Sequence, residues 1–249
     1  MGSHRRRLQR LATEFARAYP EIDDPDAFIV AEGVLVGGRI VTNPASLVRV
    51  GTPIALPGTV ELRGEAKLRA ALAAFGVRVS KRVALDLGAA AGGFTRVLLD
   101  AGASRVYAVD AGFGQLLGSV RQDARVVDLE RTNLGELSAV RVPDVIDVIT
   151  VDLSYLAIAT AVPQLAVLQL APDADLVALV KPMFELGLAE PPTNRNELAR
   201  AVSRARDGLE ASGWRAVTEI ESPVRGRNGS IEYLVHARRA PPRTSAGGA

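Results

Sequence analysis

The sequence contains no cysteine, only two histidines and only three lysines among its 30 basic residues. The absence of cysteine excludes disulfide bonds and thiolate metal sites, and it is compatible with the cytoplasm. Because His4 and His236 are too few for the usual zinc site, we predict no metal. All other basic residues are arginine, so Lys67, Lys81 and Lys181 stand out. Lysine can give up its proton near neutral pH and arginine cannot, although the three lysines could also be chance survivors.

Long apolar runs are absent too. No stretch of about 18 uncharged apolar residues is present, so we predict no membrane span. The basic start of the chain is not followed by an apolar segment, which argues against a secretory signal and again favours the cytoplasm. A formal net charge of only +2 permits nucleic-acid binding without requiring it. The hydrophobic fraction of 48% suffices for one α/β domain and a small extra module.

The first 58 residues differ in pattern from the rest. Two stretches with helical spacing precede a hairpin pattern centred on Gly37 and Gly38, and one more strand follows it. These elements are expected over 5–19, 23–33, 34–44 and 47–56. We therefore predict a small α-then-β module over 1–58, a main domain over 59–240 and a disordered tail over 241–249.

From residue 63 onward, apolar β-branched runs alternate with helical stretches. The predicted strands cover 83–87, 106–110, 124–129, 144–153 and 174–180, and the helices cover 63–75, 92–102, 115–122, 155–170 and 195–213. Two final strands, over 214–223 and 231–239, are joined by a short connection that implies an antiparallel pair. The pattern is typical of an α/β protein with a Rossmann-like, mostly parallel, seven-stranded sheet whose last strand is antiparallel.

The segment DLGAAAGGFT (86–95) places a glycine-rich turn between a strand and a helix. Gly88, Gly92 and Gly93 lack the spacing G-x-G-x-x-G, and no Lys-Ser or Lys-Thr pair follows, so the segment is neither a dinucleotide fingerprint nor a P-loop. Asp110 ends the next strand, where a carboxylate can bind two ribose hydroxyls. A nucleoside cofactor without a pyrophosphate fits this pattern, and S-adenosylmethionine is such a molecule. The alternative is a tight turn that needs glycine for packing alone.

Polar side chains collect where the predicted parallel strands end, at the edge where open α/β sheets bind ligands. They are Asp86, Asp110, Glu130, Asp152 and Lys181. Asp152 and Lys181 interrupt very apolar runs, and burying either one without a partner would be costly. They form either a ligand site or an ion pair that caps the sheet. Glu232 opens the last strand and, if that strand is antiparallel, lies at the same edge.

Six segments carry a family resemblance. In chain order they are DLGAAAGGFT, VYAVDAGFGQL, RQDARVVDLERTN, ITVDLSY, LVKPMFELG and NGSIEYLVHAR. Over about residues 63–239 the chain resembles the TlyA (haemolysin A) family, within the wider FtsJ-like methyltransferases. The resemblance implies a class I methyltransferase fold, S-adenosylmethionine as cofactor, and 2′-O-methylation of a cytidine in structured RNA, with ribosomal RNA or a ribosomal subunit as partner. The N-terminal module resembles the S4-type RNA-binding module of that family.

The resemblance also implies the site residues. The Lys-Asp-Lys-Glu tetrad of the family falls on Lys67, Asp152, Lys181 and Glu232. Lys181 is then the base that takes the proton of the ribose 2′-hydroxyl, while Lys67 favours its neutral form and the two carboxylates balance the charge. The cofactor contacts implied are Asp86, Gly88, Gly92, Gly93, Phe94, Asp110, Glu130, Asn133 and Asp152.

Two segments depart from the family pattern. The loop LGLAEPPTNRNEL (186–198) lacks the family's lysine and has two prolines, and the second helix of the N-terminal module is acidic where the family's is basic. Because acidic residues repel RNA phosphates, RNA contacts are expected elsewhere, on arginines that could equally be solvated surface. These are Arg5, Arg6, Arg7 and Arg10, and Arg225 and Arg227. The rival functions are the same chemistry on tRNA or a small molecule, and a non-catalytic RNA-binding protein.

Overall fold

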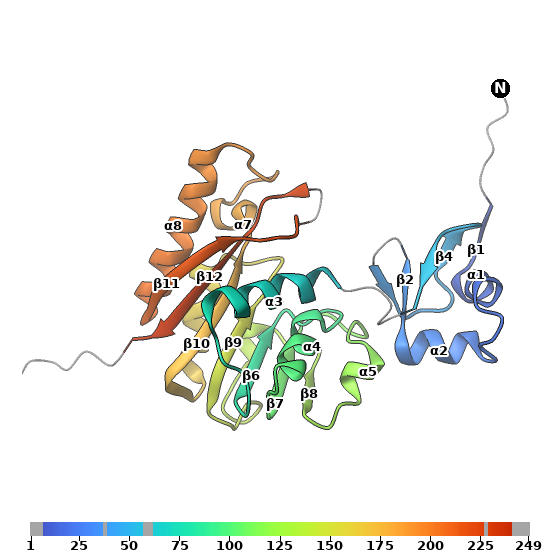
Figure 1. Cartoon of the computed structure of the whole chain (residues 1–249), viewed down its shortest axis with the longest axis horizontal. Helices are drawn as coiled ribbons and strands as arrows, with labels where there is room; N and C mark the ends of the chain where they lie inside the picture. Colours follow the sequence, from blue (N-terminus) through green and yellow to red (C-terminus); the bar gives the residue numbers. More distant parts are fainter. Residues whose placement is uncertain (1–6, 37–38, 57–61, 227–228, 241–249) are drawn as a thin grey trace, which may run out of the picture.

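The computed structural model describes residues 7–36, 39–56, 62–226 and 229–240. Its main feature is a seven-stranded sheet with the order β11-β12-β10-β9-β6-β7-β8 (Figure 1). The strands are β6 (Val83–Leu87), β7 (Arg105–Val109), β8 (Val126–Leu129), β9 (Ile146–Val151), β10 (Leu170–Val180), β11 (Trp214–Glu221) and β12 (Tyr233–Arg239). β12 is antiparallel to both neighbours, whereas the pairs from β10 to β8 are parallel. The predicted mostly parallel sheet with an antiparallel last strand is confirmed.

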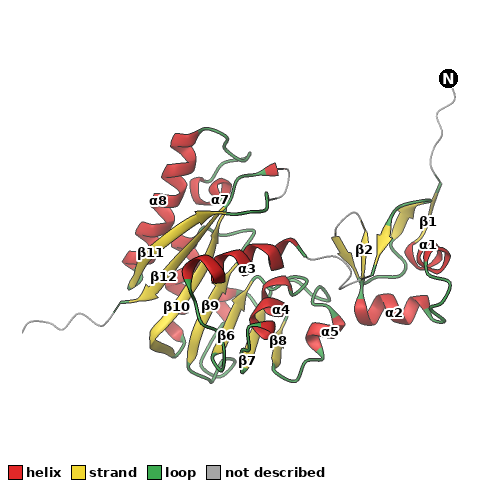
Figure 2. Ribbon diagram, in the orientation of Figure 1, coloured by secondary structure: helices red, strands yellow, loops and turns green. Residues whose placement is uncertain are grey.

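Helices cover both faces of this sheet (Figure 2). One face carries α3 (Arg63–Phe75), α4 (Gly93–Asp100) and α5 (Gly118–Arg121), and the other carries α6 (Ile158–Ala161), the 3₁₀ helix η2 (Val162–Val167) and α8 (Arg195–Ala211). Two short elements, η1 (Leu134–Glu136) and α7 (Pro182–Leu186), follow β8 and β10. This is the doubly wound arrangement in which ligands bind beyond the carboxyl ends of the strands.

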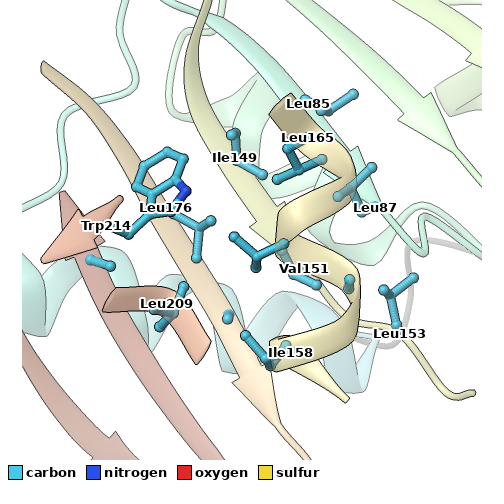
Figure 3. Packing of buried hydrophobic residues seen from close by; sticks show 14 of the residues in the cluster. Leu85, Leu87, Ile149, Val151, Leu153, Ile158, Leu165, Leu176, Leu209 and Trp214 are labelled. Carbon is cyan, nitrogen blue, oxygen red and sulfur yellow. The ribbon is translucent and has the colours of Figure 1, made fainter. Parts of the chain in front are cut away.

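The two cores follow from the alternation of side chains along each strand. Leu85 and Leu87 of β6 belong to the cluster under α6, η2 and α8, whereas Ala84 belongs to the cluster under α3, α4 and α5. Figure 3 shows the first cluster, where Ile149 of β9 lies near Leu165 of η2. Burial on both faces explains why these strands read as nearly continuous apolar runs.

The N-terminal segment forms a third, smaller cluster with two small sheets (Figure 1, blue). Its elements are β1 (Leu8–Arg10), α1 (Leu11–Ala18), α2 (Pro25–Glu32), β2 (Val34–Val36), β3 (Arg39–Val41), β4 (Leu47–Arg49) and β5 (Ile54–Ala55). β2 and β3 pair antiparallel, as the hairpin pattern predicted. The S4-type assignment of this module stays a prediction. Its predicted boundary at 58, the turn at Gly37 and Gly38, and the tail over 241–249 lie outside the described residues.

Several predicted elements were wrong in detail, among them the helix over 115–122, of which only α5 (Gly118–Arg121) is helical. The helix expected over 5–19 begins only at Leu11, because Leu8–Arg10 pairs with β4. The single strand over 47–56 is two strands, separated by a turn at Gly51 with φ +80°. The helix over 155–170 is shorter and changes to a 3₁₀ helix at Val162–Val167, where Pro163 lacks the N–H that an α-helix needs. In the part of the chain that the structure describes, no helix is both long and apolar enough to cross a membrane.

Candidate active site

A pocket of about 240 Å³ opens where the first parallel strands end. It is lined by Gly88, Ala90, Val109, Asp110, Ala111, Gln115, Thr132, Leu134, Asp152, Leu153, Ser154 and Tyr155. Gly88, just after β6, has φ +86°, and a Cβ there would lie 2.4 Å from the carbonyl oxygen of Asp152. Only glycine therefore allows the turn after β6 to lie against the end of β9.

Asp110 is held in the wall of this pocket by the backbone. Its Oδ2 accepts from the N–H of Ala90 at 2.9 Å, and its Oδ1 accepts from the N–H of Gly112 at 2.6 Å. Ala90 has φ +45°, an uncommon value for a residue with a Cβ. The carboxylate thus fixes the glycine-rich turn, and each oxygen keeps a further lone pair that can accept from a ligand hydroxyl.

Asp86 lies beneath the pocket and is fully buried. Its carboxylate accepts from Thr95 Oγ1 at 2.6 Å and from Thr150 Oγ1 at 2.8 Å. Burial raises the pKa of Asp86 to about 6, although both hydroxyls act in the opposite direction. The residue joins the start of α4 to β9 and is not among those lining the pocket. Its position fits support of the turn rather than contact with a ligand.

Glu130, expected near a cofactor, instead anchors the loop between β7 and α5. Its Oε1 accepts from the N–H groups of Gln115 and Leu116, at 2.7 and 3.1 Å. Burial alone would raise the pKa of Glu130, but these backbone hydrogen bonds and the charge of Arg121 outweigh it and lower the pKa. Asn133 is exposed and caps η1, bonding to Glu136. Both residues shape the edge of the pocket without lining it.

Three further residues expected to contact the cofactor, Gly92, Gly93 and Phe94, lie at the start of α4. Gly92 is the N-cap residue of that helix, and its Cα lies against Leu116 and Val120. Gly93 and Phe94 line a second pocket of about 230 Å³, which shares Gly88, Ala90 and Asp152 with the first. The glycine-rich turn is therefore exposed on both sides to space in which a ligand can lie.

The four tetrad residues come together in one pocket of about 800 Å³, although they lie far apart in the sequence. Lys67 is on α3, Asp152 follows β9, Lys181 follows β10 and Glu232 precedes β12. Lys67 Nζ donates to Glu232 Oε2 at 2.5 Å, and Lys181 Nζ lies 2.6 Å from Asp152 Oδ1. The antiparallel direction of β12 brings its first residues to the edge where the parallel strands end.

The two ion pairs differ in burial. The side chains of Lys67 and Glu232 are only 7% and 5% exposed, whereas those of Lys181 and Asp152 are 16% and 24% exposed. Gly226 backs the Glu232 carboxylate so closely that a Cβ there would lie 2.0 Å from Oε1. Both pairs line the pocket, but the first is nearly buried and the second is more open to solvent. Each lysine of the pocket therefore lies beside a carboxylate.

Two polar residues at this site were missed from the sequence. Lys181 Nζ donates to Ser154 Oγ at 2.9 Å, and Ser154 lines both the 240 Å³ and the 800 Å³ pocket. Glu185 of α7 is 2% exposed and accepts from the N–H of Ile158 at 2.6 Å. Both lie within the segments ITVDLSY and LVKPMFELG, but neither was singled out there, because each acts through a contact between separate segments.

The small and the large pocket adjoin. They share Gly88, Ala90, Asp152 and Ser154, so a ligand beside Asp110 would lie next to a ligand beside Lys181. The outer wall of the large pocket includes Ala189, Glu190 and Pro191 of the loop that departs from the family pattern. The arrangement can hold two molecules with a lysine and a carboxylate at the place where they meet.

The predicted RNA-binding arginines are only partly covered by the described residues. Arg7 is exposed beside β1, and Arg10 is paired with Asp26 at 2.8 Å. Arg225 is exposed and lies 3.5 Å from Glu221. Arg5, Arg6 and Arg227 lie outside the described residues. Arg225 directly precedes Gly226, which packs on Glu232, but it lines a separate pocket beside α8 and β11 and not the tetrad pocket.

Comparison with known proteins points to one family. The model of the FtsJ-like methyltransferases matches residues 61–239. The chain is 39% identical over 222 residues to a Mycobacterium tuberculosis protein named 16S/23S rRNA (cytidine-2′-O)-methyltransferase TlyA, covering 84% of this chain and 81% of that protein. It is 34% identical to Hemolysin A of Brachyspira hyodysenteriae, covering 84% and 90%. A solved structure from Streptococcus thermophilus, provisionally named a hemolysin, superposes with a TM-score of 0.71 at 28% identity, covering 95% and 90%.

Proposed function

The chain belongs to the FtsJ-like methyltransferase family, and on that premise we propose that it methylates the 2′-hydroxyl of a cytidine in ribosomal RNA. It is an S-adenosylmethionine-dependent methyltransferase, as its family and fold require. The observation that carries the proposal is the junction of two pockets, one beside Asp110 and one holding both lysine–carboxylate pairs. The substrate class comes from the relatives, one of which is named for cytidine 2′-O-methylation of 16S and 23S rRNA.

The residues of the small pocket fit the cofactor. S-adenosylmethionine supplies an electrophilic methyl group on a positively charged sulfur. Asp110, already fixed by two backbone N–H groups, offers its remaining lone pairs to the ribose hydroxyls. Thr132 and Leu134 would border the adenine, and Gly88 lets backbone lie close to the amino acid part. Asp86, Glu130 and Asn133, proposed from sequence as contacts, act here through the loops that they hold.

Lys181 is proposed as the base. A ribose 2′-hydroxyl is a weak acid, so its oxygen attacks the methyl group effectively only as its proton leaves. Lys181 Nζ donates to Ser154 Oγ and lies 2.6 Å from Asp152 Oδ1, and both of those residues line the small pocket as well as the large one. The proton of the hydroxyl would pass to Nζ as the oxygen takes the methyl group, whose bond to sulfur breaks with the electron pair left on the sulfur. Arginine at this position could not take that proton, because it stays charged.

Lys67 and Glu232 are proposed to complete the tetrad from the opposite side of the pocket. Their mutual hydrogen bond and near-complete burial fix both side chains. Fixed dipoles and charges at a site from which water is excluded act on a reacting oxygen more strongly than they would in water. The pair is therefore proposed to position the ribose, while Asp152, beside Lys181, offsets the proton charge that arrives there. Arg7 and Arg225, both exposed, are proposed to contact RNA phosphates outside the pocket.

The test is transfer of radiolabelled methyl groups from S-adenosylmethionine to separated small subunits, large subunits and protein-free ribosomal RNA. All acceptors come from cells that lack the enzyme, and tRNA serves as a competing acceptor. We expect label in ribosomal RNA and, after digestion to nucleosides, in 2′-O-methylcytidine. Label confined to tRNA, or label in a base rather than a ribose, would contradict the proposal. Retained cofactor binding with no labelled RNA would redirect the search to small-molecule acceptors.

A further inference from the structure

Glu185 is a buried acid for which the tetrad chemistry has no use. Its side chain is 2% exposed, and its Oε1 accepts from the backbone N–H of Ile158 at 2.6 Å. Its Oε2 is buried without a hydrogen-bond partner among the described residues. Burial raises the pKa of Glu185 to about 7, against the opposing effects of the Ile158 N–H and the positive charge of Arg204 on α8. Burying a carboxyl group with one oxygen lacking a hydrogen-bond partner lowers the stability of the fold, which points to a role for Glu185 other than packing.

The residue lies between the two walls of the tetrad pocket. One wall is formed by Lys181 and the first turn of α7, including Met183 and Phe184. The other wall is the segment after β9, which carries Asp152 and Ser154 and ends where α6 begins. Lys181 Nζ joins the two walls at the start of that segment. Glu185 joins them at its end, by binding the first residue of α6.

The same turn of chain links Glu185 to Lys181. The carbonyl oxygen of Lys181 accepts from the N–H groups of Phe184 and Glu185, at 2.9 and 3.2 Å. The Lys181 backbone and the Glu185 carboxylate therefore move as one unit. Lys181 Nζ lies 2.6 Å from Asp152 Oδ1 and 2.9 Å from Ser154 Oγ. Any shift of α6 relative to α7 would change both distances.

We propose that Glu185 is a positioning residue for methyl transfer: by holding the N-terminus of α6 against α7, it sets the placement of Lys181 against Asp152 and Ser154. The inference rests on the proposed function of Lys181. This positioning role requires that residue 185 carry a hydrogen-bond acceptor on a side chain as long as that of glutamate, and it does not require a negative charge. Glutamine meets that requirement, aspartate is one methylene too short, and methionine has the volume but no strong acceptor.

Three variants test this with the ribosomal RNA that the wild-type enzyme labels as acceptor. We expect Glu185→Met and Glu185→Asp each to lower kcat about tenfold or more, since small misplacements of reacting groups have effects up to about 100-fold. KM for RNA and the Kd for S-adenosylmethionine should stay within about threefold, because Glu185 contacts neither ligand and Asp110 and the glycine-rich turn keep their own hydrogen bonds. Glu185→Gln should retain kcat within about threefold of wild type. Circular dichroism and thermal melting check that each variant is folded.

The pattern of outcomes separates positioning from a structural role. A folded Glu185→Met variant with wild-type kcat would overturn the inference. If that variant does not fold, an active aspartate variant beside an inactive glutamine variant would overturn it, because charge and not reach would then matter. A shift of the melting temperature alone, with kcat unchanged in all three, would mean that Glu185 only stabilises the fold. Failure of the wild-type enzyme to label ribosomal RNA would instead refute the proposed function itself.

Discussion

Replacing one residue of the buried pair Lys67–Glu232 should destabilise the fold more than replacing both. The two charges lie 2.5 Å apart, and their side chains are 7% and 5% exposed. Replacing one partner with an apolar residue leaves the other charge buried and uncompensated, which typically costs about 3–5 kcal/mol. We therefore expect Lys67→Met and Glu232→Met each to lower the free energy of unfolding by about that amount. In a chain of this size the melting temperature would fall by roughly 6–20 °C.

The double variant should recover most of this loss. Replacing both charges with apolar residues of similar volume is often neutral or stabilising, so the double variant should lie within about 1 kcal/mol of wild type. The coupling energy of the cycle is then about 5 kcal/mol or more, well beyond the usual non-additivity of independent sites. All three variants should have lost methyl transfer, because the pocket would lack its second lysine–carboxylate pair. The double variant would thus be about as stable as wild type but inactive.

Urea denaturation followed by circular dichroism measures the cycle. The exposed pair Arg206–Glu219, 3.1 Å apart with side chains 43% and 37% exposed, provides the control. Arg206→Met should cost less than about 1 kcal/mol. The reasoning is refuted if the single substitutions at Lys67 and Glu232 cost no more than the control. It is equally refuted if the double variant loses the sum of the two single losses.

Three other predictions concern the cofactor side of the site. Asp110→Asn should weaken S-adenosylmethionine binding about 10- to 100-fold in calorimetry, because hydrogen bonds to a charged acceptor contribute about 1.5–3 kcal/mol; an unchanged Kd would contradict the assignment. Gly88→Ala should lower kcat strongly, because the new Cβ would lie 2.4 Å from the carbonyl oxygen of Asp152 and displace that residue. The control is Gly213→Ala, which should leave kcat unchanged because Gly213 also has a positive φ, +80°, but has nothing within 4 Å of the added Cβ. The pKa of Asp86 is about 6 in the folded state against 3.8 for the free group, so the folded state binds its proton more tightly. This contributes about 3 kcal/mol to the free energy of unfolding below pH 4, and the contribution is lost as the pH rises through 6. Urea titrations from pH 4 to 7.5 should show that decline in the wild type and its loss in Asp86→Asn; identical pH profiles would refute the buried-acid assignment.

The sheet and most of the tetrad could be predicted because both follow from local pattern. Strand ends are visible in the sequence, and Asp152 and Lys181 each follow directly on an apolar strand. The reversal of the last strand then places Glu232 at the same edge. Lys67 was different: it lies in an ordinary amphipathic helix, and although the scarcity of lysine made it stand out, only the family resemblance assigned it to the site.

Other features depend on contacts between segments and could not be predicted. α7 has five residues, too few for a helical period, so Glu185 gave no sign of its burial. Asp86 follows the alternation of β6, which directs its side chain beneath the turn and toward Thr95 and Thr150, not into the pocket. The strand β1 forms only because β4 offers a partner, which no pattern within 5–19 could indicate.

The most direct test of the account compares two lysine-to-arginine substitutions. Lys181→Arg places a guanidinium beside Asp152, which stays charged and so cannot accept a proton as a lysine amine can. Lys81→Arg makes the same change at an exposed site. Single-turnover methyl transfer to ribosomal RNA should fall at least about 100-fold for Lys181→Arg, with cofactor Kd within about threefold, while Lys81→Arg matches the wild type. Methyl transfer by Lys181→Arg at the rate of Lys81→Arg would show that Lys181 is not the base.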